Sequence, residues 1–590
     1  MQSLLAFYQG RVDDFNERLS YIKGQLFVSS MLRLVVFIGT VVAIYLFFGN
    51  TRAVLAIVIM GTALFLFLVS RHTDMHYERD KFNALVKINQ IEIEVLNRNY
   101  QHLPEGNEYK DPLHFFSQDI DLFGRGSFYQ YSNRTALLQG SDRLAFMLKE
   151  NGIENILEKQ GAIQELSKMP EWRQDFSAVA SLTNTTTDTA SILKWLANYK
   201  PFVPKIMTWL PRAFSLVSVV LAVLYFLGLL SGAIFLLWFL LGFVVSGTYM
   251  KKITKLGAAA GKIQSTFSQY NKLLTSIEEV AFNSVLLKEK KGEIISKGKK
   301  TSSVLRAFSD LLNALDQNNN IFYLMVGNGL FLRALATSQG IEKWIAEYGE
   351  SVESWFNTVA FFDAFNSLGN FAFNHPGYAF PVVMDEGRVL RSKEAGHPLL
   401  QPEKSVLNDF QIDNEQFFIV TGANMAGKST FLRTVSLQIV MANMGLPVCA
   451  KEVSYSPIKL ITSMRTTDSL TDDESYFFSE LKRLKFIVDE IQKDRYFIVL
   501  DEILKGTNST DKAKGSRKFV EKLVGSSATG IIATHDLSLC EAAKELPQIK
   551  NYYFDAEIID DELHFDYKFK NGICQNMNAS FLLKKMGIVN

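Results

Sequence analysis

A glycine-rich segment that ends in lysine and serine carries the clearest chemical signal in this 590-residue sequence. Gly422 and Gly427 are separated by four residues, and Lys428 and Ser429 follow directly. An apolar run precedes the segment and a helix-forming run follows it, which is the arrangement of a phosphate-binding P-loop. The glycines let successive backbone N–H groups face phosphate oxygens, and the helix N-terminus adds the positive end of its dipole. The segment therefore predicts a nucleoside triphosphate site.

The residues of this loop have separate expected roles. The Lys428 ammonium would reach the β- and γ-phosphate oxygens, and the Ser429 hydroxyl would bind Mg²⁺. ATP and Mg²⁺ are therefore the expected cofactors. The nucleotide-binding residues predicted along the loop are Gly422, Ala423, Asn424, Met425, Ala426, Gly427, Lys428, Ser429 and Thr430.

A second apolar strand supplies acidic residues for the same site. Tyr496–Glu502 reads YFIVLDE, and its apolar residues are typical of a buried strand that ends in two carboxylates. We expect Asp501 to bind Mg²⁺ and Glu502 to polarise the attacking water. A third strand, Thr529–Thr534, ends at His535, which either senses the γ-phosphate or is a structural turn histidine. Together with the P-loop lysine, Glu502 and His535 are the predicted catalytic residues.

These segments follow one another in the order found in a known ATPase family. Thr421–Arg433 (TGANMAGKSTFLR), Asp501–Asp511 (DEILKGTNSTD) and Ala533–His535 (ATH) resemble the ATPase motifs of the MutS family. The segment from Gly396 to Pro398, followed by Asn408, is similar to the strand and loop that precede the P-loop in that family. Pieces that look like its helical core occur at Asp121–Gly140, Gln160–Leu166 and Asp363–Phe371.

The resemblance implies how the site is assembled. ATP sites would form at a head-to-head dimer, so we expect a homodimer. Ser475–Glu480 (SYFFSE) resembles the helix start whose serine reaches the partner's nucleotide, although Asp472–Glu474 precedes Ser475 where relatives have glycine. Asn408 and Ser475 are therefore further expected nucleotide-binding residues. The dimer would close on ATP and open on hydrolysis, and long helices within 255–316 would form a lever and a clamp.

Four apolar stretches in two pairs explain a slightly positive mean hydropathy of +0.06 in a chain with 21% charged residues. The first pair covers 34–48 and 53–70, and the second pair lies within 213–250. Each approaches the roughly 20 residues needed to cross a hydrocarbon core of about 30 Å. The sequence thus predicts two transmembrane hairpins, with two buried hairpins of a soluble core as the alternative.

The basic residues that flank these stretches predict their orientation. Lysines and arginines accumulate on one side of all four stretches, whereas Arg52 stands alone on the other side. The positive-inside rule therefore places both termini and the ATPase in the cytoplasm. We expect a multi-pass protein of the plasma (inner) membrane.

The predicted fold is α plus α/β and multidomain. An N-terminal segment, 1–101, would contain the first hairpin and an exit helix over 71–101. A helical core (102–212), the second hairpin (213–250), lever and clamp helices with the end of the core (251–378) and an ABC-type P-loop ATPase domain (379–590) would follow. The apolar stretch Ile321–Leu332 contains Asn328, and we interpret it as buried core rather than a fifth span.

The ligand of the clamp is less determined by the sequence. In relatives the clamp encircles DNA, so double-stranded or branched DNA is a candidate. The run Lys288–Lys300 holds six lysines and could contact phosphates, although a solvated hairpin tip is an equal interpretation. About 30 residues before the first span are too few for a mismatch-reading domain, so no mismatch specificity is expected. A transporter-like ABC ATPase and a nucleotide-switched membrane scaffold remain alternatives.

Overall fold

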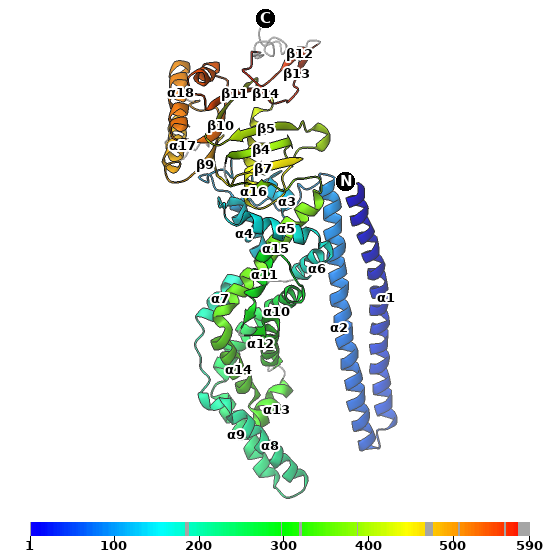
Figure 1. The fold of residues 1–590 in the computed structure, drawn as a ribbon. Coiled ribbons are helices and arrows are strands. Elements are labelled where there is room, and N and C mark those ends of the chain that lie inside the picture. The colour runs from blue at the N-terminus through cyan, green and yellow to red at the C-terminus, as the bar shows by residue number, and fades with distance from the viewer. Residues whose placement is uncertain are drawn as a thin grey trace.

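In the computed structural model, a mixed α/β unit stands at one end of the molecule and two helical arms extend from it (Figure 1). The structure describes residues 2–182, 188–296, 298–317, 321–385, 387–465, 476–505, 508–559 and 562–575. Both arms run in the same direction, away from the strands (Figure 1).

The first arm is a hairpin of two long helices, α1 (Gln2–Leu46) and α2 (Thr51–Leu96). Residues three or four apart on α1 are buried, which is the stripe expected for a helix that packs along a partner. The Tyr8 hydroxyl donates to Asn374 Oδ1 at 2.6 Å and fixes the base of the arm to the core. The expected exit helix over 71–101 is not a separate element, because α2 continues without a break from the apolar stretch.

The second arm and the core are helical. Their helices are α3 (Phe128–Ser132), α4 (Leu138–Lys149), α5 (Ile156–Ser167), α6 (Pro170–Ser181), α7 (Thr189–Ala197), α8 (Leu210–Phe226), α9 (Gly232–Gly247), α10 (Met250–Glu279), α11 (Val285–Gly292), α12 (Thr301–Asp316), α13 (Ile321–Phe331), α14 (Arg333–Tyr348) and α15 (Val352–Asn374). Helices α10, α12 and α14 form the shaft of the arm, and α8, α9 and α13 form its far end (Figure 1).

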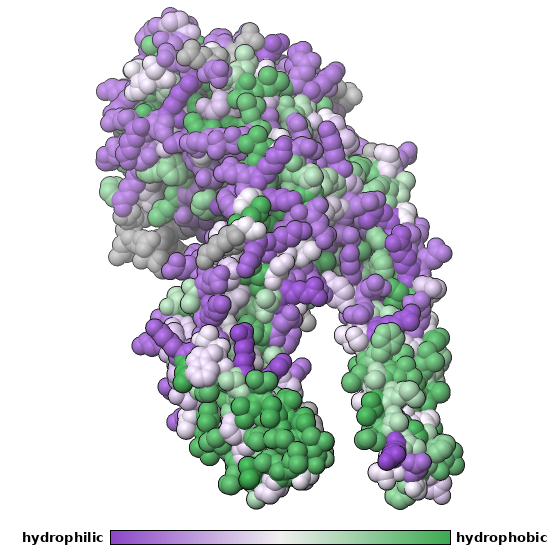
Figure 2. All heavy atoms as spheres, turned by 60° about the horizontal axis from the view of Figure 1, so that its bottom comes forward, coloured by the Kyte–Doolittle hydropathy of each residue, from purple (hydrophilic) through white to green (hydrophobic). Residues whose placement is uncertain are grey.

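The far ends of both arms are apolar (Figure 2). Within the described residues, α1 and α2 are long and apolar enough to cross a membrane, by length and composition. A third candidate exists if α9 and α10, bent by 64° at their junction, count as one span, and α8 is a shorter apolar helix of 17 residues. The prediction of four spans is thus met fully only for the first pair.

Helix α13 is part of the second apolar end. It packs closely on α9, since a Cβ at Gly242 would lie 2.3 Å from the Gly329 carbonyl oxygen. Asn328 is buried and accepts a hydrogen bond from the Ala334 backbone at 2.9 Å, whereas Met325 is 48% exposed. The interpretation of this segment as buried core is therefore correct for one face of the helix only.

The basic run Lys288–Lys300 has two interpretations from the sequence, a phosphate contact and a solvated hairpin tip. It covers α11 and the small hairpin of β1 (Ile295–Ser296) and β2 (Lys299–Lys300), near the core and away from the apolar end (Figure 1). Lys290 pairs with Glu293 at 2.6 Å, and Lys291 donates to two backbone carbonyls. Part of the run is thus engaged within the protein.

Within the described residues, the α/β unit contains a six-stranded main sheet, a four-stranded second sheet, the two-stranded β12-β13 sheet and the α-helices α16, α17 and α18. The main sheet has the order β14-β11-β6-β10-β9-β8, in which β8, β9, β10, β6 and β11 are parallel and β14 is antiparallel. A second sheet has the order β3-β7-β4-β5. The elements are β3 (Val382–Val383), β4 (Arg388–Ala395), β5 (Asn408–Asp413), β6 (Phe417–Gly422), α16 (Lys428–Asn443), β7 (Glu452–Tyr455), β8 (Lys459–Ser463), α17 (Tyr476–Glu490), β9 (Tyr496–Asp501), α18 (Ser509–Gly525), β10 (Thr529–Ala533), β11 (Ile549–Phe554), β12 (Glu557–Ile559), β13 (Glu562–His564) and β14 (Lys570–Asn571).

Candidate nucleotide site

The P-loop connects the central strand of the main sheet to α16. All six residues of β6 are buried, so the strand presents a fixed platform from which the loop leaves. Gly422 has φ 149° and Gly427 has φ 107°, and both conformations favour glycine. A Cβ at Gly422 would also lie 2.6 Å from the Phe554 carbonyl oxygen. The two glycines of the motif are therefore required by the backbone itself.

Lys428 lies in the first turn of α16 and is 7% exposed. Its Nζ donates to the carbonyl oxygens of Gly422 at 2.7 Å and Ala423 at 2.9 Å. Burial lowers the pKa of Lys428, and the nearby carboxylates of Asp501 and Glu502 oppose this shift. The ammonium group thus stands inside the loop, where phosphate oxygens would meet it.

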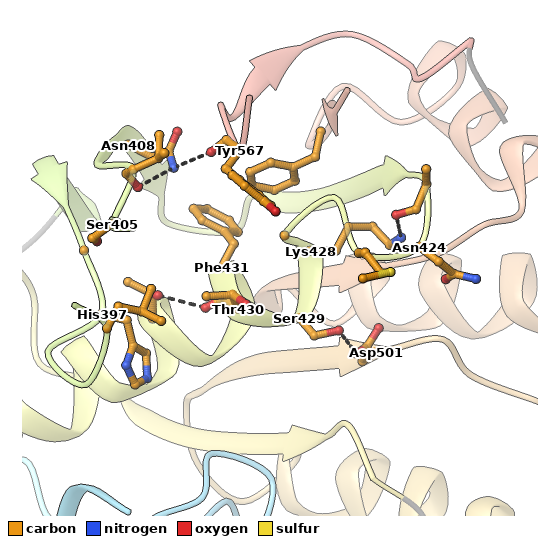
Figure 3. Close-up of a pocket in the computed structure, with 18 of the residues that line it drawn as sticks. His397, Ser405, Asn408, Asn424, Lys428, Ser429, Thr430, Phe431, Asp501 and Tyr567 are labelled. Carbon is orange, nitrogen blue, oxygen red and sulfur yellow. Dashed lines mark hydrogen bonds between the residues drawn. The ribbon is translucent and has the colours of Figure 1, made fainter. Parts of the chain in front are cut away.

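Ser429 and Asp501 meet although they come from different elements. The Ser429 hydroxyl donates to Asp501 Oδ2 at 2.7 Å (Figure 3). Asp501 ends β9, which is separated from β6 by β10 alone, and the carboxyl ends of these parallel strands share one edge. A hydroxyl and a carboxylate oxygen at this distance are the donors that Mg²⁺ takes beside phosphate oxygens. The residues present therefore fit a magnesium ion.

Glu502 follows directly in a strained conformation, with φ 53°. Its backbone N–H donates to the Ala533 carbonyl at 2.9 Å, and Lys512 Nζ lies 2.7 Å from its Oε1. Burial raises the pKa of Glu502, but the hydrogen bond and the charge of Lys512 outweigh it and leave the pKa below its usual value. The side chain expected to polarise water is thus held by an ion pair to α18.

His535 is part of the same cluster. Its Nε2 lies 3.4 Å from Lys428 Nζ. Burial lowers the pKa of His535, and the charge of Lys428 lowers it further. A neutral imidazole at the end of β10 can accept or donate a hydrogen bond beside the phosphate position. The structure therefore brings Lys428, Glu502 and His535 together, as expected.

A pocket of about 720 Å³ extends from the P-loop toward the second sheet. The side chains that line it include His397, Phe431 and Tyr567 (Figure 3), and the Tyr567 ring lies beside the loop, 3.2 Å from where a Cβ at Gly427 would stand. Asn408 also lines it, and its Nδ2 donates to the Tyr567 carbonyl at 3.0 Å while its Oδ1 accepts from Phe569. Asn408 thus positions the Tyr567 segment over the pocket. The volume and the aromatic rings suit a nucleoside.

Comparison with known proteins agrees with this geometry. Residues 418–584 match the family model MutS domain V. The chain is 31% identical over 233 residues to the DNA mismatch repair protein MutS of Desulfatibacillum aliphaticivorans. The aligned region covers 38% of this chain and 26% of that protein. It is 31% identical over 214 residues to the DNA mismatch repair protein MSH4 of Arabidopsis thaliana, covering 35% and 25%. It is 29% identical over 233 residues to the human MutS protein homolog 4, covering 38% and 24%.

The C-terminal region is a MutS-type ATPase domain. Domains of this kind are ABC-type ATPases that bind ATP and magnesium. The chain matches only about a quarter of the length of these relatives. The similarity therefore supports conclusions about the ATPase domain. Conclusions about the helical arms rest on the structure.

Hydrogen bonds and ion pairs connect the MutS-type ATPase domain to the helical core. Asp119, which is 7% exposed, accepts hydrogen bonds from the Thr462 hydroxyl and from the backbone N–H groups of Met464 and Arg465. Asp121 pairs with Arg465 at 2.7 Å and with Arg433 of α16 at 3.2 Å. The helix that begins at the P-loop is thus connected directly to the core.

Some site residues were not predicted, and one prediction lies outside the described residues. Tyr567 lines the site and Lys512 pairs with Glu502, but an isolated aromatic or lysine residue gives no spacing signal. His397 lies in the Gly396–Pro398 segment that resembles the family, although it was not among the predicted site residues. Ser475 belongs to the segment 466–475, which the structure does not describe. Glu480 of the same motif is described, and its carboxylate accepts from the backbone N–H groups of Leu504 and Lys505.

Proposed function

We propose that this protein is a membrane-anchored MutS-type ATPase that hydrolyses ATP at a homodimer interface and thereby moves its helical arms. The contact between Ser429 Oγ and Asp501 Oδ2 carries the proposal, because it provides the two oxygen donors of a magnesium site at the mouth of a P-loop. Bound Mg²⁺ would neutralise charge on the phosphates.

The residues of the chain would divide the remaining work. Backbone N–H groups of the P-loop and Lys428 bind and orient the triphosphate, and the aromatic rings that line the pocket hold the nucleoside. Glu502 orients the attacking water, and His535 hydrogen-bonds near the γ-phosphate. Ser475 and the loop before α18 would approach the partner subunit's nucleotide in the dimer.

The two apolar arm ends support the membrane anchor. They point in the same direction from the α/β unit (Figure 2), so one bilayer could receive both. With the basic flanks of both hairpins on the ATPase side, the domain and the termini would lie in the cytoplasm. Resistance of the protein to extraction by alkaline carbonate tests this anchor, and release into the supernatant would contradict it.

DNA binding is the second candidate function. The exposed part of the Lys288–Lys300 run favours it, as do the names of the relatives. Stimulation of ATP hydrolysis by duplex or branched DNA that fades as salt is raised would support phosphate contact. An ATPase rate that no DNA structure alters would contradict DNA binding and would favour a nucleotide-switched membrane scaffold. Stimulation by a solute in sealed vesicles would instead favour a transporter.

A further inference from the structure

A second cavity, of about 620 Å³, lies between the first arm and the helical core. Its walls come from α2, α6, α15 and the loop over 133–136. It shares no lining residue with the nucleotide pocket. Because α2 belongs to the apolar hairpin and α6 and α15 belong to the core, a molecule in this cavity would contact both.

Asn366 of α15 lines the cavity with an unsatisfied amide. The residue is 3% exposed, and neither its Nδ2 nor its Oδ1 has a hydrogen-bond partner in the described parts of the chain. A buried polar group without a hydrogen-bond partner destabilises the folded protein. An amide that lines a cavity of this size is therefore placed to bind something that the protein does not itself supply.

Arg173 of α6 brings a buried positive charge to the same wall. It is 3% exposed, its Nε donates to the Leu166 carbonyl at 2.8 Å and its Nη1 donates to Asn370 Oδ1 at 2.9 Å. Asn366 and Asn370 are four residues apart on α15 and share one face. The guanidinium thus contacts the face of α15 that carries the unsatisfied amide.

The carboxylates of the cavity are already occupied. Glu92 accepts from Arg134 Nε at 2.6 Å and from Asn374 Nδ2 at 2.7 Å. Asp80 pairs with the neighbouring Arg79 at 2.7 Å. Arg173 has no carboxylate within 4.0 Å among the residues that the structure describes, although the charge of Glu92 raises its pKa against the effect of burial. Glu92 already pairs with Arg134, so the lining carries three basic side chains, Lys87, Arg134 and Arg173, against two carboxylates. The wall therefore favours an anion.

The other residues that line the cavity indicate what the rest of the anionic ligand is like. Lys87 stands at the exposed rim, where a second positive charge can attract a charged group. Ile88, Ile91 and Leu182 provide apolar surface inside. A ligand that fits has a negatively charged end, a hydrogen-bonding group and an apolar or aromatic body, which is the usual mixture for a small-molecule pocket.

We propose that this cavity binds a small organic anion, a carboxylate or a phosphate ester on an apolar or aromatic body. The anionic oxygens would accept hydrogen bonds from Arg173 and from Asn366 Nδ2, and a donor on the ligand would bind Asn366 Oδ1. The bound molecule would join α2 to the core. This site is independent of the proposed ATPase activity.

Ligand-observed NMR on the full-length protein in a non-ionic detergent tests the proposal. The probes are 4-hydroxybenzoate and phenyl phosphate, with neutral 4-hydroxybenzamide as the uncharged match and empty micelles as the blank. We expect at least one anion to bind at least tenfold more tightly than the amide. Equal binding of the amide, or binding of neither anion at several millimolar, would overturn the proposal.

Three variants test whether the anion binds in this cavity. Asn366→Leu keeps the side-chain size and removes both amide atoms, so it should fold and weaken anion binding at least tenfold. Lys87→Ala should weaken binding about threefold, whereas the exposed Lys168→Ala, on the same helical body, should leave it unchanged. Unaltered binding to a folded Asn366→Leu variant would show that the anion binds elsewhere and would contradict the assignment.

Discussion

The Ser429 hydroxyl lies 2.7 Å from Asp501 Oδ2, although the two residues are 72 positions apart in the sequence. The contact exists because β6 and β9 are parallel strands on either side of β10, so that the P-loop and the aspartate leave the sheet at one edge. A magnesium ion bound by the P-loop serine would meet this carboxylate without any rearrangement of the sheet.

Glu502→Gln should preserve ATP binding and stop turnover. The amide keeps the size of the side chain but cannot polarise water as a carboxylate does. We expect the hydrolysis rate to fall at least 100-fold and the ATP-bound dimer to accumulate, measured by phosphate release and by size-exclusion chromatography with ATP. ATP hydrolysis at the normal rate would contradict the role of Glu502 in polarising the attacking water.

Lys512→Ala should raise the basal rate of ATP hydrolysis. Lys512 Nζ lies 2.7 Å from Glu502 Oε1, so the lysine competes with water for the carboxylate. We expect a threefold to tenfold increase, which corresponds to about 1 kcal/mol of barrier. Lys518→Ala, at an exposed position of the same helix, is the control. A rate that falls in Lys512→Ala but not in the control would mean that the ion pair positions Glu502 for catalysis.

Asp119→Ala should separate the ATPase domain from the core. Removal of this carboxylate takes the acceptor from the buried Met464 N–H and the buried Thr462 hydroxyl, at a cost of about 2–3 kcal/mol. Thermal unfolding should begin at a lower temperature than in the unaltered protein, whereas Asp489→Ala, which removes a surface ion pair, should change it little. An unchanged unfolding temperature for Asp119→Ala would show that the junction does not depend on this contact.

Stability should fall as pH decreases from about 6.5 to 5. Burial lowers the pKa of His375 to about 4, and its Nε2 lies 2.8 Å from the Tyr131 hydroxyl. Since the unfolded histidine binds its proton near pH 6.5, the unfolded state takes up more protons in this range. The loss from this residue is about 2 kcal/mol at pH 5. His375→Gln should show a shallower pH dependence in thermal unfolding, and an unchanged dependence would contradict the assignment.

The sequence points to the candidate nucleotide site because its residues lie in short contiguous motifs. The P-loop, Asp501 and His535 each follow a strand, and parallel strands bring their ends together. Lys512 and Tyr567 could not be predicted, since their positions depend on how α18 and the segment before β14 fold over the site. No local spacing encodes such contacts.

Helix lengths in the arms were harder to predict than their apolar character. The charged residues after position 70 suggested a separate exit helix, yet the helical pattern continues and α2 has no break before Leu96. The basic run over 288–300 is open to two interpretations from the sequence, a phosphate contact and a solvated hairpin tip. The structure places the apolar helices α8, α9 and α13 at the far end of the second arm. Which helices reach that end depends on tertiary packing, which the charge pattern of the sequence does not encode.

The central claim is that the P-loop and Asp501 together bind Mg²⁺-ATP. The most direct test measures ATP binding and hydrolysis by the detergent-purified protein with Mg²⁺ and with EDTA, beside the Lys428→Ala and Asp501→Asn variants. We predict magnesium-dependent hydrolysis that both substitutions reduce at least 100-fold while the fold is retained. Hydrolysis that persists in the folded Lys428→Ala variant would contradict the account.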